Sequence, residues 1–569
     1  MKIHGRTFLL LLALLPACVD AEPIGPDFEQ RLFSILGGLE VGEALTLAGV
    51  NAQSIVLPGG EDGARYLFVP FLAAEEGSVR LRVRVSGEAL EELDSGVALF
   101  NRSPDFSTRA LRSPLTDDSS HLRLREFERR RAAAFLANPA ARAAVDSDIA
   151  SRAQVAPPAV GETVAMRVIN RSPENPDLCS NPLMRSGRVA AVTEHAILVE
   201  DVLNPVALSA ADIERIASEF DDLVLPVAVE NFGEPTDIDG NGRVFIFMTS
   251  AINEMADREG GGITVGFTFA LDLLPRTSAV GTCAASNEGE IFYLIAPDPQ
   301  GEVGVRVPEE VVQQLATSII VHELQHMINA GRRLYEVPDA REFEELWLNE
   351  GLSHIAEELV FYAATGLQPR SDIGWRTLTS SQQIFEAYQR FVRDNLAIYS
   401  EYLTAPDAET LMGKSRNDDD FTTRGASWAF LRYLADQTPS EDAELFRALV
   451  NSPIGGVENL DQVLEISPLT WMQRWTVSNF VDNLRDEDIE EQFKQPSWDY
   501  RSIFEEEIGF LPLSPHFLQP GDTLRVTLRG GGSSYLVLQA AGDGQARINT
   551  IQGGDPVFGE FRASVVRLK

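Results

Sequence analysis

The chain has 569 residues, of which 44% are hydrophobic, and its formal net charge is -37 at pH 7. This length and composition predict several domains with substantial hydrophobic cores. An acidic surface of this kind disfavours nucleic acid and anionic membrane surfaces as partners, so we expect no binding of nucleic acid.

Residues 1–17 have the pattern of a signal peptide of the lipoprotein type. Lys2 and Arg6 precede an apolar run from Phe8 to Leu15, which is too short to span a membrane. Residues 15–18, Leu-Pro-Ala-Cys, are similar to a bacterial lipobox, which predicts that Cys18 carries lipid. We therefore expect a membrane-anchored protein of the bacterial cell envelope, at the outer membrane or cell surface. The alternative is ordinary signal cleavage, which predicts a secreted protein.

Short alternating apolar runs follow, such as Val79-Arg-Leu-Arg-Val-Arg-Val85. Strict alternation predicts antiparallel strands with one buried face. We interpret residues 18–120 as an N-terminal β-sandwich domain. Residues 121–156 are rich in Ala, Arg and Leu and predict a helical connector, and residues 157–205 predict a β-rich segment that leads into the next domain.

The pattern of residues 206–490 predicts one domain with buried strands and many helices. Asp237-Ile-Asp-Gly-Asn-Gly242 resembles the first half of a calcium loop. The closing acidic residue is missing, because Met248 stands in its place. Either another part of the chain completes a calcium site near Asp237, or the segment is only a tight turn. Ile291 to Ile295, or the segment at residues 260–265, is a candidate edge that holds a substrate backbone, with ordinary core sheet as the alternative.

The most specific motif is His322-Glu323-Leu-Gln-His326. On a helix, its two imidazoles lie one turn apart on the same face and can hold one zinc ion. Glu323 beside them can act as the base that takes a proton from water. The surrounding helical pattern is largely apolar, so two core histidines without a metal would be a costly alternative.

Glu350 is the expected third zinc ligand. It lies in the middle of a second predicted helix, from about Ala340 to Ala364 with Asp339 as its cap, and apolar residues flank it. His354 follows it by one turn, and is either a partner that orients a ligand or a surface histidine. The alternative third ligands are Glu345, His354, Glu357 and Glu358.

These residues resemble those of the gluzincin zinc peptidases, in which the third ligand is a Glu on a second helix. The closer resemblance is to the bacterial hyicolysin-like neutral metallopeptidases, and it covers roughly Gly161 to Val481. It includes the Asp237 segment and the block from Ile291 to Gly351. The resemblance implies a zincin-like catalytic domain with a mixed sheet, the His-Glu-x-x-His helix and a helical lobe.

One segment departs from the gluzincin pattern. These enzymes often use a downstream Tyr or His to stabilise the oxyanion, whereas Phe421-Thr-Thr-Arg-Gly-Ala-Ser-Trp428 contains neither. Arg424 is a cationic candidate for this role, with pairing to a surface acidic residue as the alternative. The signature that holds a free amino terminus in aminopeptidases is not visible, which favours an endopeptidase.

The remaining features concern the C-terminus and the cysteines. Residues 505–569 return to a strand pattern and predict a small C-terminal β domain. Of the 3 Cys, the lipid takes Cys18 and leaves Cys179 and Cys283. One pair of cysteines in an exported protein predicts a disulfide, with two unpaired thiols as the alternative.

The sequence therefore predicts an α+β multidomain protein whose zincin-like catalytic domain is flanked by small β-sandwich domains. We expect an extracytoplasmic zinc-dependent endopeptidase, with His322, His326 and Glu350 as zinc ligands, Glu323 as the base, and protein or peptide substrates. The rival hypothesis is a non-catalytic surface lipoprotein with β binding modules and a structural zinc site.

Overall fold

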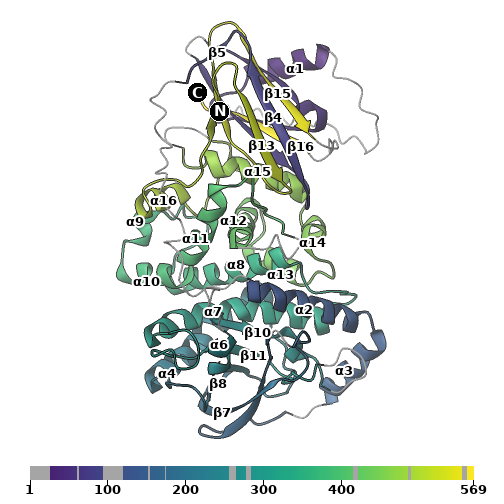
Figure 1. Ribbon diagram of the computed structural model, residues 1–569, viewed down its shortest axis with the longest axis vertical. Coiled ribbons are helices and arrows are strands. Elements are labelled where there is room, and N and C mark those ends of the chain that lie inside the picture. The colour runs from purple at the N-terminus through teal and green to yellow at the C-terminus, as the bar shows by residue number, and fades with distance from the viewer. Residues whose placement is uncertain are drawn as a thin grey trace, which may run out of the picture.

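The computed structural model describes residues 26–60, 63–93, 119–151, 154–172, 175–255, 264–276, 283–413, 421–484, 489–553 and 561–569. The protein is a mixed α+β multidomain molecule. Three layers follow one another along its long axis: a β-sandwich, a helical lobe and an α/β lobe (Figure 1). Every helix in the described part of the chain is too short or too polar to cross a membrane.

Both ends of the chain build the β-sandwich. Its elements are α1 (Pro26–Gly37), β1 (Ala44–Ala48), η1 (Gly49–Ala52), β2 (Ser54–Pro58), β3 (Ala64–Leu72), β4 (Ser78–Ser86), β5 (Leu90–Glu91), β12 (His516–Phe517), β13 (Thr523–Arg529), β14 (Leu536–Ala540), β15 (Gln545–Gly553) and β16 (Phe561–Arg567). One sheet has the order β1-β16-β3-β14-β12, with β5 also paired to β14, and the other has the order β13-β4-β15-β2. Strands from the two ends of the chain alternate throughout the second sheet, and in the first sheet they alternate from β1 to β14.

This interleaving corrects the prediction of two separate β domains at residues 18–120 and 505–569. The alternation in β4 is as expected, with Val79, Leu81, Val83 and Val85 buried and the arginines between them exposed. However, both neighbours of β4 come from the C-terminal end, since β13 and β15 pair with it antiparallel. Alternation indicates which face of a strand is buried, but it does not indicate which strand lies beside it.

The α/β lobe contains the predicted motif helix. Its elements are α2 (Ser119–Leu136), α3 (Pro139–Ser151), β6 (Thr163–Val168), β7 (Leu183–Val192), β8 (Ala196–Asp201), α4 (Ala210–Glu219), η4 (Phe220–Val224), α5 (Leu225–Phe232), β9 (Val244–Thr249), α6 (Ser250–Met255), β10 (Gly266–Thr268), η5 (Ala270–Leu273), β11 (Ile291–Ile295), α7 (Glu309–Gly331) and η6 (Arg332–Glu336). Its sheet has the order β10-β11-β9-β8-β7-β6. The β-rich segment at residues 157–205 is therefore part of this sheet.

Strand β10 is one edge of that sheet. It pairs antiparallel with β11, whereas β8, β9 and β11 are parallel to one another. Helix α7 packs against both β10 and β11, so the motif helix lies directly behind the sheet edge.

The helical lobe carries Glu350, the predicted third ligand, on α8. Its elements are α8 (Leu346–Thr365), α9 (Trp375–Leu378), α10 (Gln382–Phe391), α11 (Arg393–Thr404), α12 (Phe421–Gln437), α13 (Asp442–Val450), α14 (Gly456–Val463), α15 (Pro468–Val481), η7 (Glu491–Phe493) and α16 (Tyr500–Glu507). Helix α8 packs against α7 on one side and α12 on the other.

Local sequence explains the limits of the two central helices. Glu309 and Glu310 lie in the first turn of α7, where carboxylates complement the helix dipole. Helix α8 ends at Gly366, whose φ of 74° is in the left-handed region that glycine favours. It begins at Leu346 with Glu345 as its cap, later than the expected start near Ala340, because Asp339 has a left-handed φ of 61° and interrupts the chain there.

Candidate metal centre

Helices α7 and α8 bring the three predicted ligands together. His322 and His326 lie on one face of α7, and Glu350 faces them from α8 with its side chain fully buried. Nε2 of His322 lies 3.4 Å from Oε2 of Glu350, and Nε2 of His326 lies 3.5 Å from Oε1. Each imidazole Nε2 therefore lies close to one of the two carboxylate oxygens of Glu350.

This donor set fits a zinc ion. Zinc bonds of about 2.0–2.2 Å in a tetrahedral site place neighbouring ligand atoms roughly 3.3–3.6 Å apart. The two distances between the imidazole nitrogens and the Glu350 oxygens, 3.4 and 3.5 Å, lie in that range. Two imidazoles and one carboxylate leave the fourth position of such a site for water or substrate.

The two imidazoles differ in their protonation. Burial and the nearby Arg125 guanidinium lower the pKa of His326 to about 3, so this ring is neutral and able to bind a metal. Burial also disfavours the charged form of His322, but contacts with Glu350 and Glu357 outweigh it and raise the pKa of His322 to about 10. Binding of a metal at Nε2 would therefore release a proton from His322.

Further contacts orient the rings. Nδ1 of His322 lies 2.8 Å from Oε1 of Glu357, and Oγ of Ser353 lies 3.0 Å from Nδ1 of His326. The hydrogen bond at Nδ1 of His322 leaves its Nε2 directed at the candidate metal position. The Oγ of Ser353 also lies 3.3 Å from Nε2 of His326, so it contacts both nitrogens of that ring. Nδ1 of His354 lies 3.5 Å from the other oxygen of Glu357, so His354 contacts a residue that orients a ligand.

The other alternative ligands have different partners. Glu345 accepts a hydrogen bond from the indole of Trp347. Glu358 accepts hydrogen bonds from Trp428, Trp498 and Tyr362, inside the helical lobe.

Glu323 lies next to the ligands with its carboxylate already engaged. Its Oε2 accepts a hydrogen bond of 2.7 Å from the backbone N–H of Thr268 in β10. The same oxygen accepts one of 2.8 Å from Nη2 of Arg125 in α2. The predicted base therefore contacts both the sheet edge and a helix that the sequence indicated only as a connector.

Arg424 reaches the same centre from α12. Its Nη1 lies 3.5 Å from Oε2 of Glu350, and its side chain is buried. Two glycines allow this close packing. A Cβ on Gly351 would lie 2.9 Å from Leu431 of α12, and a Cβ on Gly425 would lie 2.4 Å from the backbone of Tyr399 in α11.

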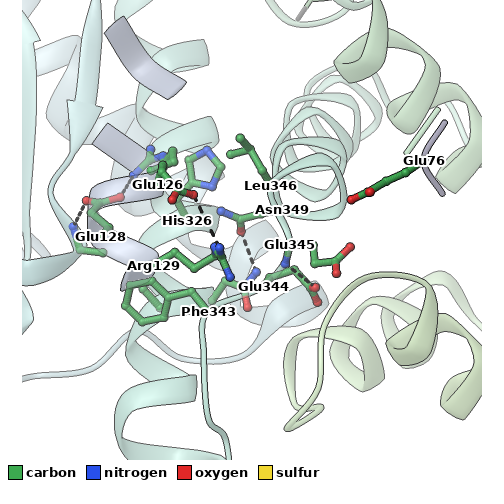
Figure 2. A pocket seen from close by; sticks show the side chains of 14 residues that line it. Glu76, Glu126, Glu128, Arg129, His326, Phe343, Glu344, Glu345, Leu346 and Asn349 are labelled. Carbon is green, nitrogen blue, oxygen red and sulfur yellow. Dashed lines mark hydrogen bonds and ion pairs between the residues drawn. The ribbon is translucent and has the colours of Figure 1, made fainter. Parts of the chain in front are cut away.

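A cavity of about 220 Å³ opens beside His326 (Figure 2). Residues of α2, α7 and α8 line it, among them Glu128, His326 and Asn349. Figure 2 also shows Glu76 extending from the β-sandwich toward the other side of this cavity. All three layers of the molecule therefore border the space next to the candidate metal centre.

The candidate calcium segment gains a third carboxylate in the structure. Oxygen atoms of Asp237, Asp239 and Glu290 lie within 4.8 Å of one another. Glu290, which precedes β11, also accepts hydrogen bonds from Thr236 and the N–H of Ile238. Binding of calcium by this cluster stays a prediction.

The remaining predicted residues are placed as follows. Cys179 and Cys283 are joined by a disulfide, across a sequence separation of 104. The signal peptide at residues 1–17 and Cys18 lie outside the described residues, as does most of the segment at residues 260–265.

Sequence reasoning missed Arg125, Glu128 and Thr268 as residues of the site. The available signal was a buried stripe on α2 in which Arg125 and Glu128 stand in line with Ala132 and Phe135. Charged residues in a buried apolar stripe require charged partners. Their presence in α2 therefore indicates that this helix contacts charged groups of another element.

Comparisons with known proteins bear on this geometry. No protein-family model matches the chain. The chain is 22% identical over 274 residues to the neutral metalloprotease ShpI of Staphylococcus hyicus, a stretch that is 48% of this chain and 52% of that protein. The chain thus spans about half the length of the curated relative that it matches. This distant similarity, together with the His and Glu cluster on α7, supports assignment to the metallopeptidases at a coarse level.

Proposed function

We propose that the protein is a zinc-dependent endopeptidase of the gluzincin type, similar to the hyicolysin-like enzymes, and that it acts outside the cytoplasm. The observation that carries the proposal is the convergence of His322, His326 and Glu350 at spacings suited to zinc, with Glu323 beside them. We also propose that lipid on Cys18 attaches the protein to the cell envelope. If Cys18 carries no lipid, the protein would instead be secreted.

In this proposal each residue has a separate task. His322, His326 and Glu350 would hold the zinc, which when bound would polarise a peptide carbonyl and make water more acidic. Glu323 takes a proton from the attacking water and passes it to the leaving amine. Arg424 donates hydrogen bonds to the negative charge that develops on the carbonyl oxygen. The outward backbone groups of edge strand β10 hold the substrate in extended form.

The position of Arg424 favours an enzyme over a binding module with a structural zinc site. A structural site needs no buried cation next to one of its ligands, whereas a transition state with developing negative charge does. Arg424 is such a cation, since its Nη1 lies 3.5 Å from Oε2 of the proposed ligand Glu350.

The test is cleavage of a quenched casein substrate by the purified protein. We expect activity to disappear with a zinc chelator and to return on addition of zinc. Glu323→Gln should lower turnover on the order of 10²- to 10⁴-fold, because it removes general base catalysis, and should still bind zinc. Undiminished turnover in Glu323→Gln would contradict the proposed mechanism.

A further inference from the structure

Helix α2 lies against the face of the molecule that carries the candidate metal centre. It contacts η5, the segment that follows edge strand β10, and its Arg125 reaches Glu323 of α7 and Glu350 of α8. Its buried residues include Leu124, Arg125, Glu128, Ala132 and Phe135, so one whole stripe of the helix is docked. The docked charged residues are those closest to the metal position.

Arg125 binds directly to the carboxylate of Glu323, the predicted base. Its Nη2 donates to Glu323 at 2.8 Å, and its Nε lies 4.0 Å from Glu350. The side chain is only 5% exposed, so solvent does not screen these contacts. A guanidinium at this position competes with a substrate for Glu323. It also places a positive charge next to Glu350, a proposed ligand of the zinc ion.

Helix α2 also forms hydrogen bonds with the backbone at the sheet edge and just after it. Thr268 directs its N–H and its C=O away from β11. The N–H donates to Glu323, and the C=O accepts 3.0 Å from Nη1 of Arg125. Two residues further, the N–H of Ala270 donates to Glu128 at 2.6 Å. An extended peptide that adds to a sheet edge forms its hydrogen bonds with such outward C=O and N–H groups.

We propose that α2 is a built-in inhibitory segment that holds the place of the substrate. Arg125 covers Glu323 and binds the outward C=O of Thr268 in β10, while Glu128 binds the backbone N–H of Ala270 in η5. This inference rests on the proposed function, because it identifies the covered surface as the substrate site of that peptidase. Substrate then binds only to the fraction of molecules in which α2 is displaced, and the apparent affinity is the intrinsic affinity multiplied by that fraction.

The test uses three variants of the zinc-loaded full chain. Arg125→Ala removes the contact with Glu323. Phe135→Ala weakens the docking of α2 through a fully buried residue ten positions further along the helix. Arg130→Ala is the matched control, because Arg130 is on the same helix with a side chain that is 66% exposed. Thermal unfolding of each variant checks that it folds.

Two readouts are compared. The first is binding of a fluorescent peptide hydroxamate, which needs the metal position and the sheet edge to be accessible but needs no turnover. The second is kcat/KM for the quenched casein. We expect both affinity and kcat/KM to rise on the order of tenfold or more in Arg125→Ala, and in the same direction in Phe135→Ala, with no change in Arg130→Ala.

Opposite results would overturn the inference. If Arg125→Ala binds the hydroxamate no more tightly and turns over more slowly, Arg125 assists the reaction instead of blocking it. The two readouts together separate this inference from the proposed function. If the hydroxamate binds more tightly to Arg125→Ala and Phe135→Ala but no variant cleaves casein, the blocking role of α2 is supported and the peptidase proposal is contradicted.

Discussion

At the scale of residues, the centre depends on side chains that hold the ligands as well as on the ligands. Glu357 contacts Nδ1 of His322 at 2.8 Å, and the neighbouring imidazoles of His354 and His322 lower the pKa of Glu357 despite its burial. An ionised Glu357 accepts a hydrogen bond from the Nδ1–H of His322 and fixes the ring so that Nε2 points to the candidate metal position.

Glu357→Ala should therefore weaken zinc binding about 10- to 100-fold, because His322 loses its orientation. Competition with a chromogenic chelator measures the affinity. Glu357→Gln should recover part of the loss, since the amide oxygen still accepts the hydrogen bond. The control is Glu310→Ala, which removes an exposed carboxylate in the first turn of α7, the helix that carries His322. Equal zinc affinities in Glu357→Ala and the control would show that the contact has no such role.

Arg424 gives a second prediction at this scale. Arg424→Ala should lower kcat by about 10²- to 10³-fold while zinc binding is kept, the cost of losing one donor to an oxyanion. Arg424→Lys should be intermediate, because it keeps the charge but not the geometry of the guanidinium. Arg447→Ala, an exposed arginine on the neighbouring helix α13, is the control. A change in KM alone would instead indicate a role in substrate binding.

At the scale of elements, the segment that follows edge strand β10 is held by a buried carboxyl group. Asp272 in η5 accepts hydrogen bonds from the hydroxyl of Tyr293 in β11 and from the backbone N–H of Asn287. Burial raises the pKa of Asp272 to about 7, although these hydrogen bonds oppose the shift. The folded protein therefore favours the neutral form of this carboxyl group.

This shift predicts the sign of a pH effect. Below the ordinary pKa of 3.8, Asp272 is protonated in both the folded and the unfolded chain. As the pH rises toward 7, the unfolded chain loses its proton first, so the free energy of unfolding decreases. The stability that the protonated Asp272 contributes is therefore lost by the time the pH passes the pKa of the folded state. The loss amounts to about 1.4 kcal/mol for each unit by which the folded pKa exceeds the unfolded one.

Asp272→Asn removes this titration. Between about pH 5.5 and pH 8 the wild type should lose more stability than the variant does. The variant should therefore gain relative to the wild type, by a few kcal/mol at most. Urea unfolding followed by tryptophan fluorescence at both pH values measures it. A stability difference that is independent of pH would mean that Asp272 titrates normally in the fold.

At the scale of the whole molecule, the two ends of the chain depend on each other. Strand β4 lies between β13 and β15, and β3 lies between β14 and β16. The N-terminal strands therefore cannot leave as a removable domain without breaking both sheets. Inhibition by α2 does not require such removal, because α2 follows the N-terminal strands in the chain and docks on a different layer.

A truncation tests this dependence. Without residues 515–569, β3 and β4 lose the partners on both of their edges. The remaining N-terminal strands should become sensitive to protease and prone to aggregate, because unpaired strand edges are exposed. Mass spectrometry of a limited digest identifies the cleaved region. Continued protection of residues 44–91 in the truncated chain would indicate that the N-terminal strands fold alone.

The sequence by itself determined the local chemistry of this protein. The His322, Glu323 and His326 spacing places three groups on one helical face, and the alternation in β4 assigns its buried face, since both follow from the geometry of a single element. Glu350 was an expectation of the same kind, supported by the apolar residues around it.

Only the tertiary structure decided which elements meet. The pairing of β4 with C-terminal strands, the approach of Arg424 to Glu350 and the docking of Arg125 on Glu323 join residues that are far apart in the chain. The physical reason is that an element's own pattern indicates how much apolar surface it must bury. The partner that covers that surface is selected by shape and charge complementarity across the whole fold.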